Sequence, residues 1–547
     1  MSVIGQTPAT AAYDYPLLVR HLLHTPLAYY PDREIVYADG TRLTYRRFRE
    51  RIGRLADALS SLGVRPGDTV AVLDWDSHRY LECFFAVPML GAVLHTVNVR
   101  LSPEQIIYTI NHAGDDVLLV HQDFMPLVEQ IQPHIDRPCR IVLLSDGGDA
   151  TGTALDLAGE YEALLSDGDP SFEFEDFDEN TRATTFYTTG TTGDPKGVYY
   201  SHRQLVLHTL GIAASHCLAG QQGMFHSEDV YMPITPMFHV HAWGIPYLAT
   251  MAGVKQVYPG RYAPERLLSL IQDEKVTFSH CVPTILHMLL QAREQTGTDL
   301  SGWKVIIGGS ALPEGLAARA LDLGIDLYGG YGLSETCPVL TIARLDNEDS
   351  RRPAAEQLTT RCRAGRPVVM VDLRTVDERG HDVPRDGQST GEVVARAPWL
   401  TEGYLKEPER SESLWRDGYL HTGDIGFFDD KGYLKVTDRL KDVIKTGGEW
   451  ISSVQLEDIV SQMPNVNEVA AIGVADEKWG ERPLIIVVPA EDADLDEASV
   501  LEHLQQAVKD GRLSDWAVPD KVRIVDQIDK TSVGKIDKKS LRRRYGG

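Results

Sequence analysis

The stretch LTYRRFRERIGRLADALSSLGVRPGDTVAVLDW, residues 43–75, holds one complete building unit of the fold. Its apolar residues recur at steps of four and three, which predicts an amphipathic helix. They are Phe48, Ile52, Leu55, Leu59 and Leu62. Gly63 and the Pro66-Gly67 turn end the helix, and the apolar run TVAVL that follows predicts a buried strand.

The same order of helix and strand recurs along the chain. It is found in SPEQIIYTINHAGDDVLLV, residues 102–120, and in APERLLSLIQDEKVTFSHCV, residues 263–282. Alternation of this kind predicts parallel sheets with helices on both faces. From about residue 370 the pattern changes to short strands and turns, as in STGEVVARA at 389–397, which predicts a smaller antiparallel or barrel-like section.

A third pattern begins after residue 438, where the strands VNEVAAIGVAD and RPLIIVVPA precede a helix. This C-terminal part is long enough for an independent domain. We therefore predict an α/β protein with two domains. Residues 1–437 form a large N-terminal domain of parallel-sheet subdomains with the barrel-like section, and residues 438–547 form a small mobile α+β domain. The junction near Asp438 and Arg439 has no long flexible linker and is expected to be a tight hinge.

The composition limits the classes of function. The chain has 547 residues, 43% of them hydrophobic and 24% charged, which is typical of a folded protein with more than one domain. Its net charge of -25 opposes general attraction to nucleic acid or to an anionic membrane. We expect no nucleic-acid partner, and a polyanionic ligand must be held by a local site.

The sequence also indicates a location. The six cysteines are scattered, without a C-x-x-C pair or a histidine at metal-ligand spacing, which favours a reducing compartment. The first residues lack the basic and apolar regions of a secretory signal, and the last lack a prenylation or peroxisomal motif. The longest apolar stretch, FFAVPMLGAVLHTV at 84–97, is too short to span a bilayer and predicts a buried core element. We expect a cytoplasmic enzyme with no transmembrane segment.

The loop YTTGTTGDPKG, residues 187–197, has a composition that suits phosphate. Its glycines allow the backbone to approach a ligand closely, its threonines supply hydroxyl donors, and Lys196 adds a positive charge. The P-loop of NTPases requires G-x-x-x-x-G-K-[ST], but Gly197 follows the lysine here, so that interpretation fails. Taken alone, a loop of this kind is more often a tight surface turn.

Four further stretches follow this loop, and each is weak evidence alone. They are GGYGLSETCPV at 329–339, YLHTGDIG at 419–426, DRLKDVIKTGGEWISS at 438–453 and DKTSVGKIDKK at 529–539. Separately they are also consistent with a glycine-rich connection, a local turn, a charged hairpin and a solvated basic segment. In this order, over nearly the whole chain, they resemble the adenylate-forming superfamily, which includes acyl-CoA synthetases, peptide-synthetase adenylation domains and luciferases. The likeness is closest to bacterial fatty acyl-CoA synthetases.

The resemblance implies an ATP site. It assigns contacts with ATP or AMP to Thr188, Thr189, Gly190, Thr191, Thr192, Gly193, Lys196, Gly309, Gly330, Tyr331, Ser334, Asp424 and Arg439. Tyr331 is placed near the adenine, and the carboxylate of Asp424 accepts from both ribose hydroxyls. Glu335 is assigned to Mg²⁺, for which a carboxylate is a suitable ligand. The residues assigned to catalysis are Lys535, Lys196, Glu335 and His239.

The resemblance also implies a second half-reaction with CoA. Lys441 takes the hinge position about which the C-terminal domain rotates. The segment assigned to the CoA channel comprises Lys445, Gly447, Gly448 and Trp450. Glycines suit a channel in which the arm of CoA passes close to the backbone. One departure from the family pattern is Asp529, which stands where many relatives have proline.

The stretch MFHVHAWG, residues 237–244, is the candidate acyl pocket. His239 and Trp243 lie four residues apart and would share one face of a helix. In the fatty acyl-CoA synthetases that this chain resembles, the aromatic residue gates the acyl tunnel and the histidine lies by the reacting carboxylate. Core packing is the competing interpretation for each of the two residues.

Together these features predict an AMP-forming acyl-CoA ligase that uses ATP, Mg²⁺ and CoA. A carboxylic acid is activated as an acyl-adenylate, and the acyl group is then transferred to CoA. A medium- or long-chain fatty acid is the expected substrate, and a short acid such as 3-methylmercaptopropionate is the alternative. A stand-alone adenylating enzyme for a carrier protein and a catalytically silent ligand-binding protein are further alternatives. The resemblance also suggests a homodimer through the N-terminal region, which is equally suited to packing on its own domain.

Overall fold

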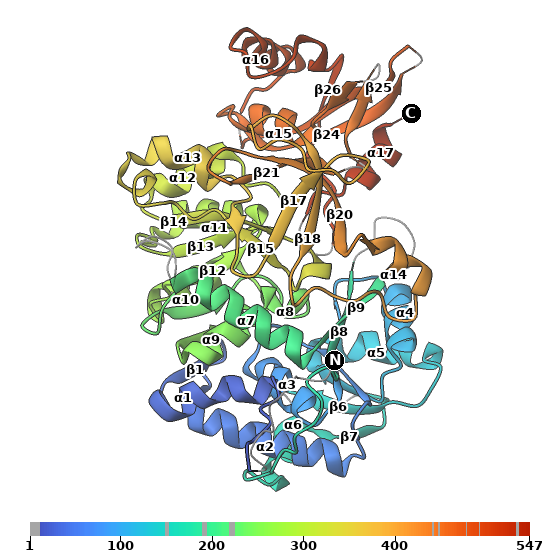
Figure 1. The fold of residues 1–547 in the computed structure, drawn as a ribbon. Coiled ribbons are helices and arrows are strands. Elements are labelled where there is room, and N and C mark those ends of the chain that lie inside the picture. Colours follow the sequence, from blue (N-terminus) through green and yellow to red (C-terminus); the bar gives the residue numbers. More distant parts are fainter. Residues whose placement is uncertain are drawn as a thin grey trace.

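The structure is a computed structural model, and it describes residues 11–147, 153–188, 194–217, 225–439, 442–446, 449–476, 478–491, 493–531 and 535–546. Within these ranges the strands form two large, mainly parallel sheets and two smaller sheets (Figure 1). This arrangement confirms the predicted α/β class, with a small antiparallel section ahead of a C-terminal unit.

One large sheet has seven described strands in the order β7-β6-β5-β3-β4-β8-β9. Their bounds are β3 (Thr69–Leu73), β4 (Val93–Thr96), β5 (Val117–His121), β6 (Arg140–Leu144), β7 (Leu157–Glu160), β8 (Arg182–Thr188) and β9 (Lys196–Ser201). The neighbours run parallel except β9, which pairs antiparallel with β8. Because β8 ends at Thr188, the candidate phosphate loop starts at the edge where the carboxyl ends of the parallel strands lie, the usual place of ligand sites in such sheets.

The other large sheet has nine described strands in the order β16-β15-β14-β13-β12-β10-β11-β1-β2. Their bounds are β1 (Glu34–Tyr37), β2 (Arg42–Thr44), β10 (Val230–Pro233), β11 (Lys255–Tyr258), β12 (Phe278–Cys281), β13 (Lys304–Ile307), β14 (Asp326–Gly332), β15 (Val339–Ile342) and β16 (Arg366–Pro367). The strands from β14 to β1 are parallel, and the outer ones are antiparallel.

Most helices ahead of residue 415 pack on the two large sheets or on one another, and the last one packs on the small antiparallel sheet. The helices of this region are α1 (His24–Tyr29), α2 (Tyr45–Ser61), α3 (His78–Met89), α4 (Pro103–Ala113), α5 (Met125–Ile131), α6 (Tyr161–Asp167), α7 (His202–Cys217), α8 (Val240–Trp243), α9 (Ile245–Ala252), α10 (Pro264–Asp273), α11 (Pro283–Thr296), α12 (Glu314–Asp322), α13 (Ala354–Arg361) and α14 (Pro408–Leu414). Every residue of α3 is buried, and α3 and β4 together contain most of the apolar stretch 84–97, which is a core element as predicted. None of the helices in the described ranges combines the length and the apolar character needed to cross a membrane.

The predicted helices begin and end at the residues that the capping and glycine signals indicate. Helix α2 begins after Thr44, whose side chain accepts from the backbone N–H of Arg47, and Gly63 follows it in the left-handed region. Helix α4 begins with a capping box of Ser102 and Gln105 and ends at Gly114, which has φ +75°. Local signals and apolar spacing therefore agree in these units.

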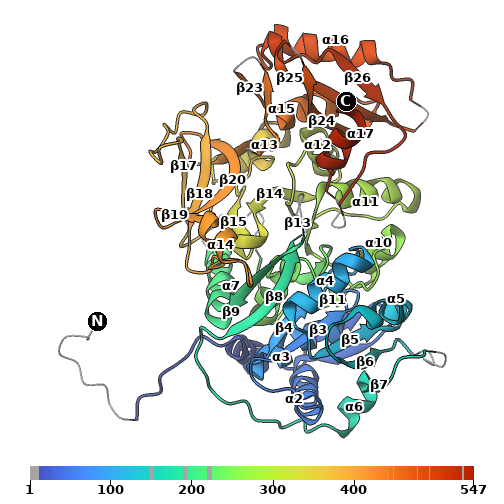
Figure 2. The same cartoon turned by 90° about the vertical axis from the view of Figure 1, so that its right-hand side faces the viewer.

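Two smaller sheets complete the chain. The antiparallel sheet contains β17 (Asp372–Val376), β18 (Gly391–Arg396), β19 (Trp415–Arg416), β20 (Tyr419–Phe428) and β21 (Leu434–Arg439). The C-terminal unit contains β22 (Ile444–Thr446), β23 (Glu449–Ile451), β24 (Val466–Asp476), β25 (Gly480–Pro489), β26 (Lys521–Ile524), α15 (Ser453–Ser461), α16 (Glu497–Lys509) and α17 (Lys538–Tyr545). This unit lies at one end of the molecule in both views (Figures 1 and 2). Strand β21 continues through Asp438 and Arg439, which still pair with β20, whereas the domain boundary at 437/438 stays a prediction.

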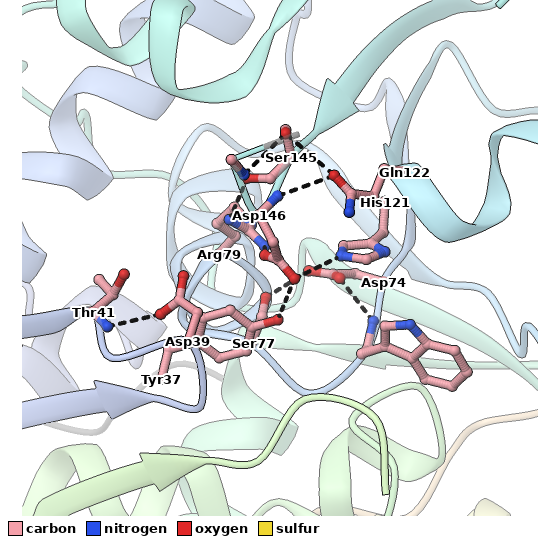
Figure 3. A network of polar contacts seen from close by, with 12 residues as sticks. Tyr37, Asp39, Thr41, Asp74, Ser77, Arg79, His121, Gln122, Ser145 and Asp146 are labelled. Carbon is pink, nitrogen blue, oxygen red and sulfur yellow. Dashed lines mark hydrogen bonds and ion pairs between the residues drawn. The ribbon is translucent and has the colours of Figure 1, made fainter. Parts of the chain in front are cut away.

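A polar network joins the two large sheets (Figure 3). Asp146, which follows β6, lies 3.1 Å from Nε2 of His121 and accepts from the hydroxyl of Tyr37 at 3.1 Å. Its other oxygen pairs with the guanidinium of Arg79, which is 2% exposed. Tyr37 belongs to β1 and His121 to β5, so one carboxylate connects the nine-stranded sheet to the seven-stranded one.

Replacement of Asp146 by alanine should lower the free energy of unfolding by about 3 kcal/mol, because it removes the carboxylate that forms an ion pair with the buried Arg79. Urea unfolding measures this loss. The control is Asp382→Ala, which removes an exposed carboxylate paired with Arg374 and should cost under about 1 kcal/mol. Equal losses for the two variants would contradict the role given to the network.

Candidate active site

Asp424 is the buried centre of one half of the site. It lies in β20, directly opposite Arg439 in β21, with its Oδ1 3.1 Å from Nε of Arg439. Its Oδ2 accepts from the hydroxyl of Tyr331 at 2.8 Å. The residue is 3% exposed, and burial raises the pKa of its carboxyl while Arg439 and Tyr331 oppose that rise. Both oxygens keep a free lone pair, so the oriented carboxylate can accept from two further hydroxyls.

The loop after β14 carries Ser334 and Glu335 in a short 3₁₀ turn, Ser334–Thr336. The turn is fixed through its backbone, because Tyr200 donates to the carbonyl of Ser334 at 2.5 Å and Thr401 donates to that of Glu335 at 3.1 Å. The side chain of Glu335 accepts from the hydroxyl of Tyr404 at 2.7 Å. Within the described residues, Oε1 of Glu335 is therefore the carboxylate oxygen that a side-chain hydrogen bond engages.

Gly330 and Gly332 in β14 both occupy closely packed positions. At Gly332 a Cβ atom would lie 1.7 Å from the carbonyl oxygen of Pro338, so only glycine fits there. At Gly330 it would lie 3.0 Å from Ile306 of the neighbouring strand β13. Gly330, which the sequence analysis assigned to ATP contacts, is therefore a closely packed residue next to Tyr331.

Thr188 and Lys196 are the described ends of the candidate phosphate loop. They are paired in register across β8 and β9, which holds the two ends of the loop together. The ammonium of Lys196 lies 4.5 Å from the ring centroid of Tyr404. The predicted loop residues Thr189, Gly190, Thr191, Thr192 and Gly193 lie outside the described residues.

Lys535 reaches this site from the C-terminal unit. Its Cε lies 3.1 Å from the position that a Cβ atom would take on Gly309, which has φ +81°. Burial, followed by the charge of Arg439, lowers the pKa of Lys535 to about 8, while Asp424 and Glu335 act in the opposite direction. The ammonium of Lys535 therefore lies within the electrostatic reach of both Asp424 and Glu335.

The candidate acyl-pocket stretch has a different backbone from the predicted helix. Residues 240–243 of α8 all have positive φ, at 49°, 54°, 47° and 59°, and Gly244 continues at 71°. The prediction that His239 and Trp243 share one face of a right-handed helix is therefore wrong. A left-handed turn costs roughly 1–2 kcal/mol per residue, and the sequence pattern gives no sign of it. Strain of this kind is concentrated at functional sites, where the surrounding packing maintains it.

The turn still directs both residues to the Lys535 side of the site. Burial and the nearby Lys535 lower the pKa of His239 to about 3, so its imidazole is neutral. The ring of Trp243 lies 5.0 Å from that of His280, and a Cβ atom on Gly308 would lie 3.0 Å from the Trp243 ring. Trp243 therefore packs against Gly308, and the side chain of Lys535 lies against the next residue, Gly309. His239 lies within the electrostatic reach of Lys535.

Two histidines near Trp243 have structural partners. His241 lies with Nε2 2.6 Å from the hydroxyl of Thr184 and is completely buried. His280 lies 2.8 Å from the hydroxyl of Tyr231 and 3.1 Å from that of Thr235. Both ring nitrogens of His280 are therefore engaged, whereas Nδ1 of His241 is buried without a hydrogen-bond partner among the described residues. The sequence analysis missed these polar groups beside Trp243.

The residues assigned to the CoA step are only partly described. Lys445 and Trp450 pair with each other across the hairpin of β22 and β23. Lys441, Gly447 and Gly448 lie outside the described residues. Their predicted roles stay predictions.

The described side chains do not by themselves form a metal site. In the part of the chain that the structure describes, no group of three His, Cys, Asp or Glu residues could hold a metal ion. Glu335 is partly exposed and contacts Tyr404, whose ring also faces the ammonium of Lys196. One carboxylate fits Mg²⁺, which is commonly held by one or two carboxylates together with substrate phosphates.

The chain belongs to the family of AMP-binding enzymes. The model of the AMP-binding enzyme matches residues 23–405, and that of the AMP-binding enzyme C-terminal domain matches residues 455–535. The five charged residues that the sequence analysis singled out, Lys196, Glu335, Asp424, Arg439 and Lys535, all lie in the site described above.

Characterised relatives cover the chain nearly end to end. It is 42% identical over 507 residues to a long-chain-fatty-acid–CoA ligase of Thermus thermophilus, and this alignment covers 92% of this chain and 90% of that protein. It is 37% identical over 537 residues to a 3-methylmercaptopropionyl-CoA ligase of Ruegeria pomeroyi, with 97% of each covered. The crystal structure of ATP-bound MatB from Rhodopseudomonas palustris superposes with a TM-score of 0.82 at 26% identity, covering 97% of this chain and 99% of that one.

The low pKa of Lys535 predicts a descending limb in the pH profile. Because Lys535 carries its charge below about pH 8 and loses it above, kcat/KM for ATP in pyrophosphate exchange should fall as the pH rises through that value. In Lys535→Arg the guanidinium stays charged, so the limb should move to higher pH even if the rate is low. An unchanged limb in Lys535→Arg would assign the titration to another group.

Proposed function

We propose that this protein is an AMP-forming acyl-CoA ligase that activates a carboxylic acid with ATP and transfers the acyl group to CoA. The observation that carries the proposal is the meeting of Lys535, from the C-terminal unit, with Asp424, Arg439 and Glu335 from the preceding sheets. Membership of the AMP-binding enzyme family and the long alignments with acyl-CoA ligases support it.

In the first step the acid carboxylate attacks the α-phosphorus of ATP and pyrophosphate leaves. Asp424 binds the ribose hydroxyls, with Arg439 and Tyr331 fixing the carboxylate for that task. Lys196 and the phosphate loop bind the outgoing phosphates, and Lys535 stabilises the charge that develops on the α-phosphate. Mg²⁺, held by Glu335 and the phosphates, would neutralise further phosphate charge. No side-chain nucleophile is required.

In the second step the CoA thiol attacks the acyl carbon and AMP leaves. Lys535 is no longer needed, and the segment with Gly447 and Gly448 is proposed to replace it after rotation at Lys441. His239, which is neutral, can donate or accept one hydrogen bond near the reacting carboxylate without adding charge. The same site thus serves two steps in turn.

The proposed substrate is a medium- or long-chain fatty acid that enters behind Trp243. The identity to the ligase for long-chain acids supports this choice. The competing candidate is a short acid such as 3-methylmercaptopropionate, which the second relative supports, as does the tight packing of Trp243 against Gly308 and His280. A cytoplasmic location and a homodimer stay predictions.

The proposal is tested by acyl-CoA and AMP formation from ATP, Mg²⁺ and CoA across a ladder of acids from C2 to C18 with 3-methylmercaptopropionate included. An optimum at C8 or longer supports the fatty-acid assignment, and an optimum at short acids supports the competing candidate. Acyl-AMP formation without thioester would contradict the CoA step and favour a carrier-protein acceptor.

Lys535→Ala should reduce adenylation by a hundredfold or more, because it removes a charged contact worth on the order of 3 kcal/mol in the transition state. ATP binding and the CoA-dependent step from added acyl-AMP should remain close to wild type. Pyrophosphate exchange and thioester formation measure the two steps separately. Near-normal pyrophosphate exchange in the variant would contradict the role of Lys535.

A further inference from the structure

Tyr404 lies between the two groups that face the ATP phosphates. Its hydroxyl donates to Oε1 of Glu335 at 2.7 Å, and its ring faces the ammonium of Lys196 at 4.5 Å from the centroid. We propose that Tyr404 is a positioning residue that sets the orientation of Lys196 and Glu335 for the metal–nucleotide complex. The inference rests on the proposed function, because it takes these two residues as the ATP-phosphate and metal contacts.

The segment that carries Tyr404 is fixed to both sides of the site. On the phosphate-loop side, Leu405 donates its N–H to the carbonyl of Gly197 at 2.8 Å, and Tyr404 forms a β-bridge with Val198. On the Glu335 side, Thr401 donates its N–H to the carbonyl of Glu335 at 3.1 Å. The same Thr401 donates its hydroxyl to the carbonyl of Tyr199 at 3.0 Å. The aromatic side chain is therefore held from β9 and from the Glu335 turn together.

The contacts of Tyr404 are more specific than core packing requires. The residue is 7% exposed, and a buried tyrosine needs a hydrogen-bond partner of some kind. Here the partner is a carboxylate of the candidate site, while the ring face meets its ammonium. One side chain thus contacts both an acid and a base of the candidate site, and it holds both before the nucleotide is present.

This arrangement lowers the cost of binding ATP. A cation over an aromatic ring is held weakly enough to move onto a phosphate, and a long lysine that is already ordered loses less freedom on binding. The hydroxyl engages Oε1 of Glu335, so Oε2 is the oxygen that would bind a metal ion. The ring therefore acts on nucleotide affinity and the hydroxyl on metal affinity, and two substitutions can separate them.

Tyr404→Phe keeps the ring and removes the hydroxyl, whereas Tyr404→Leu removes both functions. The probe is Mn²⁺ with α,β-methylene-ATP, in which the bond that the enzyme breaks is replaced. Free Mn²⁺ is followed by electron paramagnetic resonance, and analogue binding without metal is followed by calorimetry. Tyr404→Phe should weaken Mn²⁺ binding to the analogue complex about tenfold, the effect of one hydrogen bond to a charged group, with analogue affinity unchanged. Tyr404→Leu should show the same loss and, in addition, weaken the analogue severalfold.

The matched control is Tyr419→Phe, which removes a hydroxyl that donates to an exposed carboxylate, Asp372, outside the site. It should leave both affinities at the wild-type value. Wild-type metal affinity in Tyr404→Phe, or equal analogue affinity in Tyr404→Phe and Tyr404→Leu, would overturn the proposal.

Thermal unfolding identifies a variant that fails to fold. If Tyr404→Leu does, the double variant Tyr404→Phe with Glu335→Gln decides. Glu335→Gln alone weakens Mn²⁺ binding, because Glu335 is the proposed metal ligand. Tyr404→Phe added to Glu335→Gln should cause no further loss of metal affinity if the hydroxyl acts through Glu335, and a further loss would overturn the proposal. The binding measurements need no acid, so a wild-type protein that binds Mn²⁺ and the analogue but activates no acid would contradict the proposed function and leave this test readable.

Discussion

The carboxylate of Asp424 is buried between the guanidinium of Arg439 and the hydroxyl of Tyr331. A carboxylate in such surroundings is costly without partners, so the three residues constrain one another. Arg439 ends β21, directly ahead of the C-terminal unit, whose first described strand is β22. The interaction therefore connects the candidate nucleotide site to the point where the chain leaves the antiparallel sheet, and both charged residues of the pair act on the pKa of Lys535.

The electrostatics of the site follow from this pair. Burial lowers the pKa of Lys535 most and Arg439 lowers it further, while Asp424 and Glu335 oppose the shift, so Lys535 keeps its charge near neutral pH. Its side chain passes over Gly309, where a Cβ atom would collide with it. The left-handed turn at 240–243 places His239 and Trp243 on the same side. The candidate acyl-pocket residues thus lie near the charged groups of the candidate site.

The sequence predicted the parts that local patterns control. In helices such as α2 and α4 the apolar spacing agrees with the signals that begin and end the helix. The glycine-rich motifs could be recognised in the sequence because positions such as Gly332 accept only glycine. The left-handed turn was not predicted, since only long-range packing stabilises positive φ in Val240 and Trp243. The role of Tyr404 was also missed, because its partners are distant in sequence.

The central claim is that the substrate carboxylate itself attacks the α-phosphorus of ATP. The most direct measurement is the reaction of an ¹⁸O-labelled carboxylic acid with ATP and CoA, followed by mass spectrometry of AMP, pyrophosphate and phosphate. The account predicts one ¹⁸O atom in AMP, because the oxygen that joins the acyl group to phosphorus leaves with AMP. Label in inorganic phosphate, or AMP without label, would contradict it.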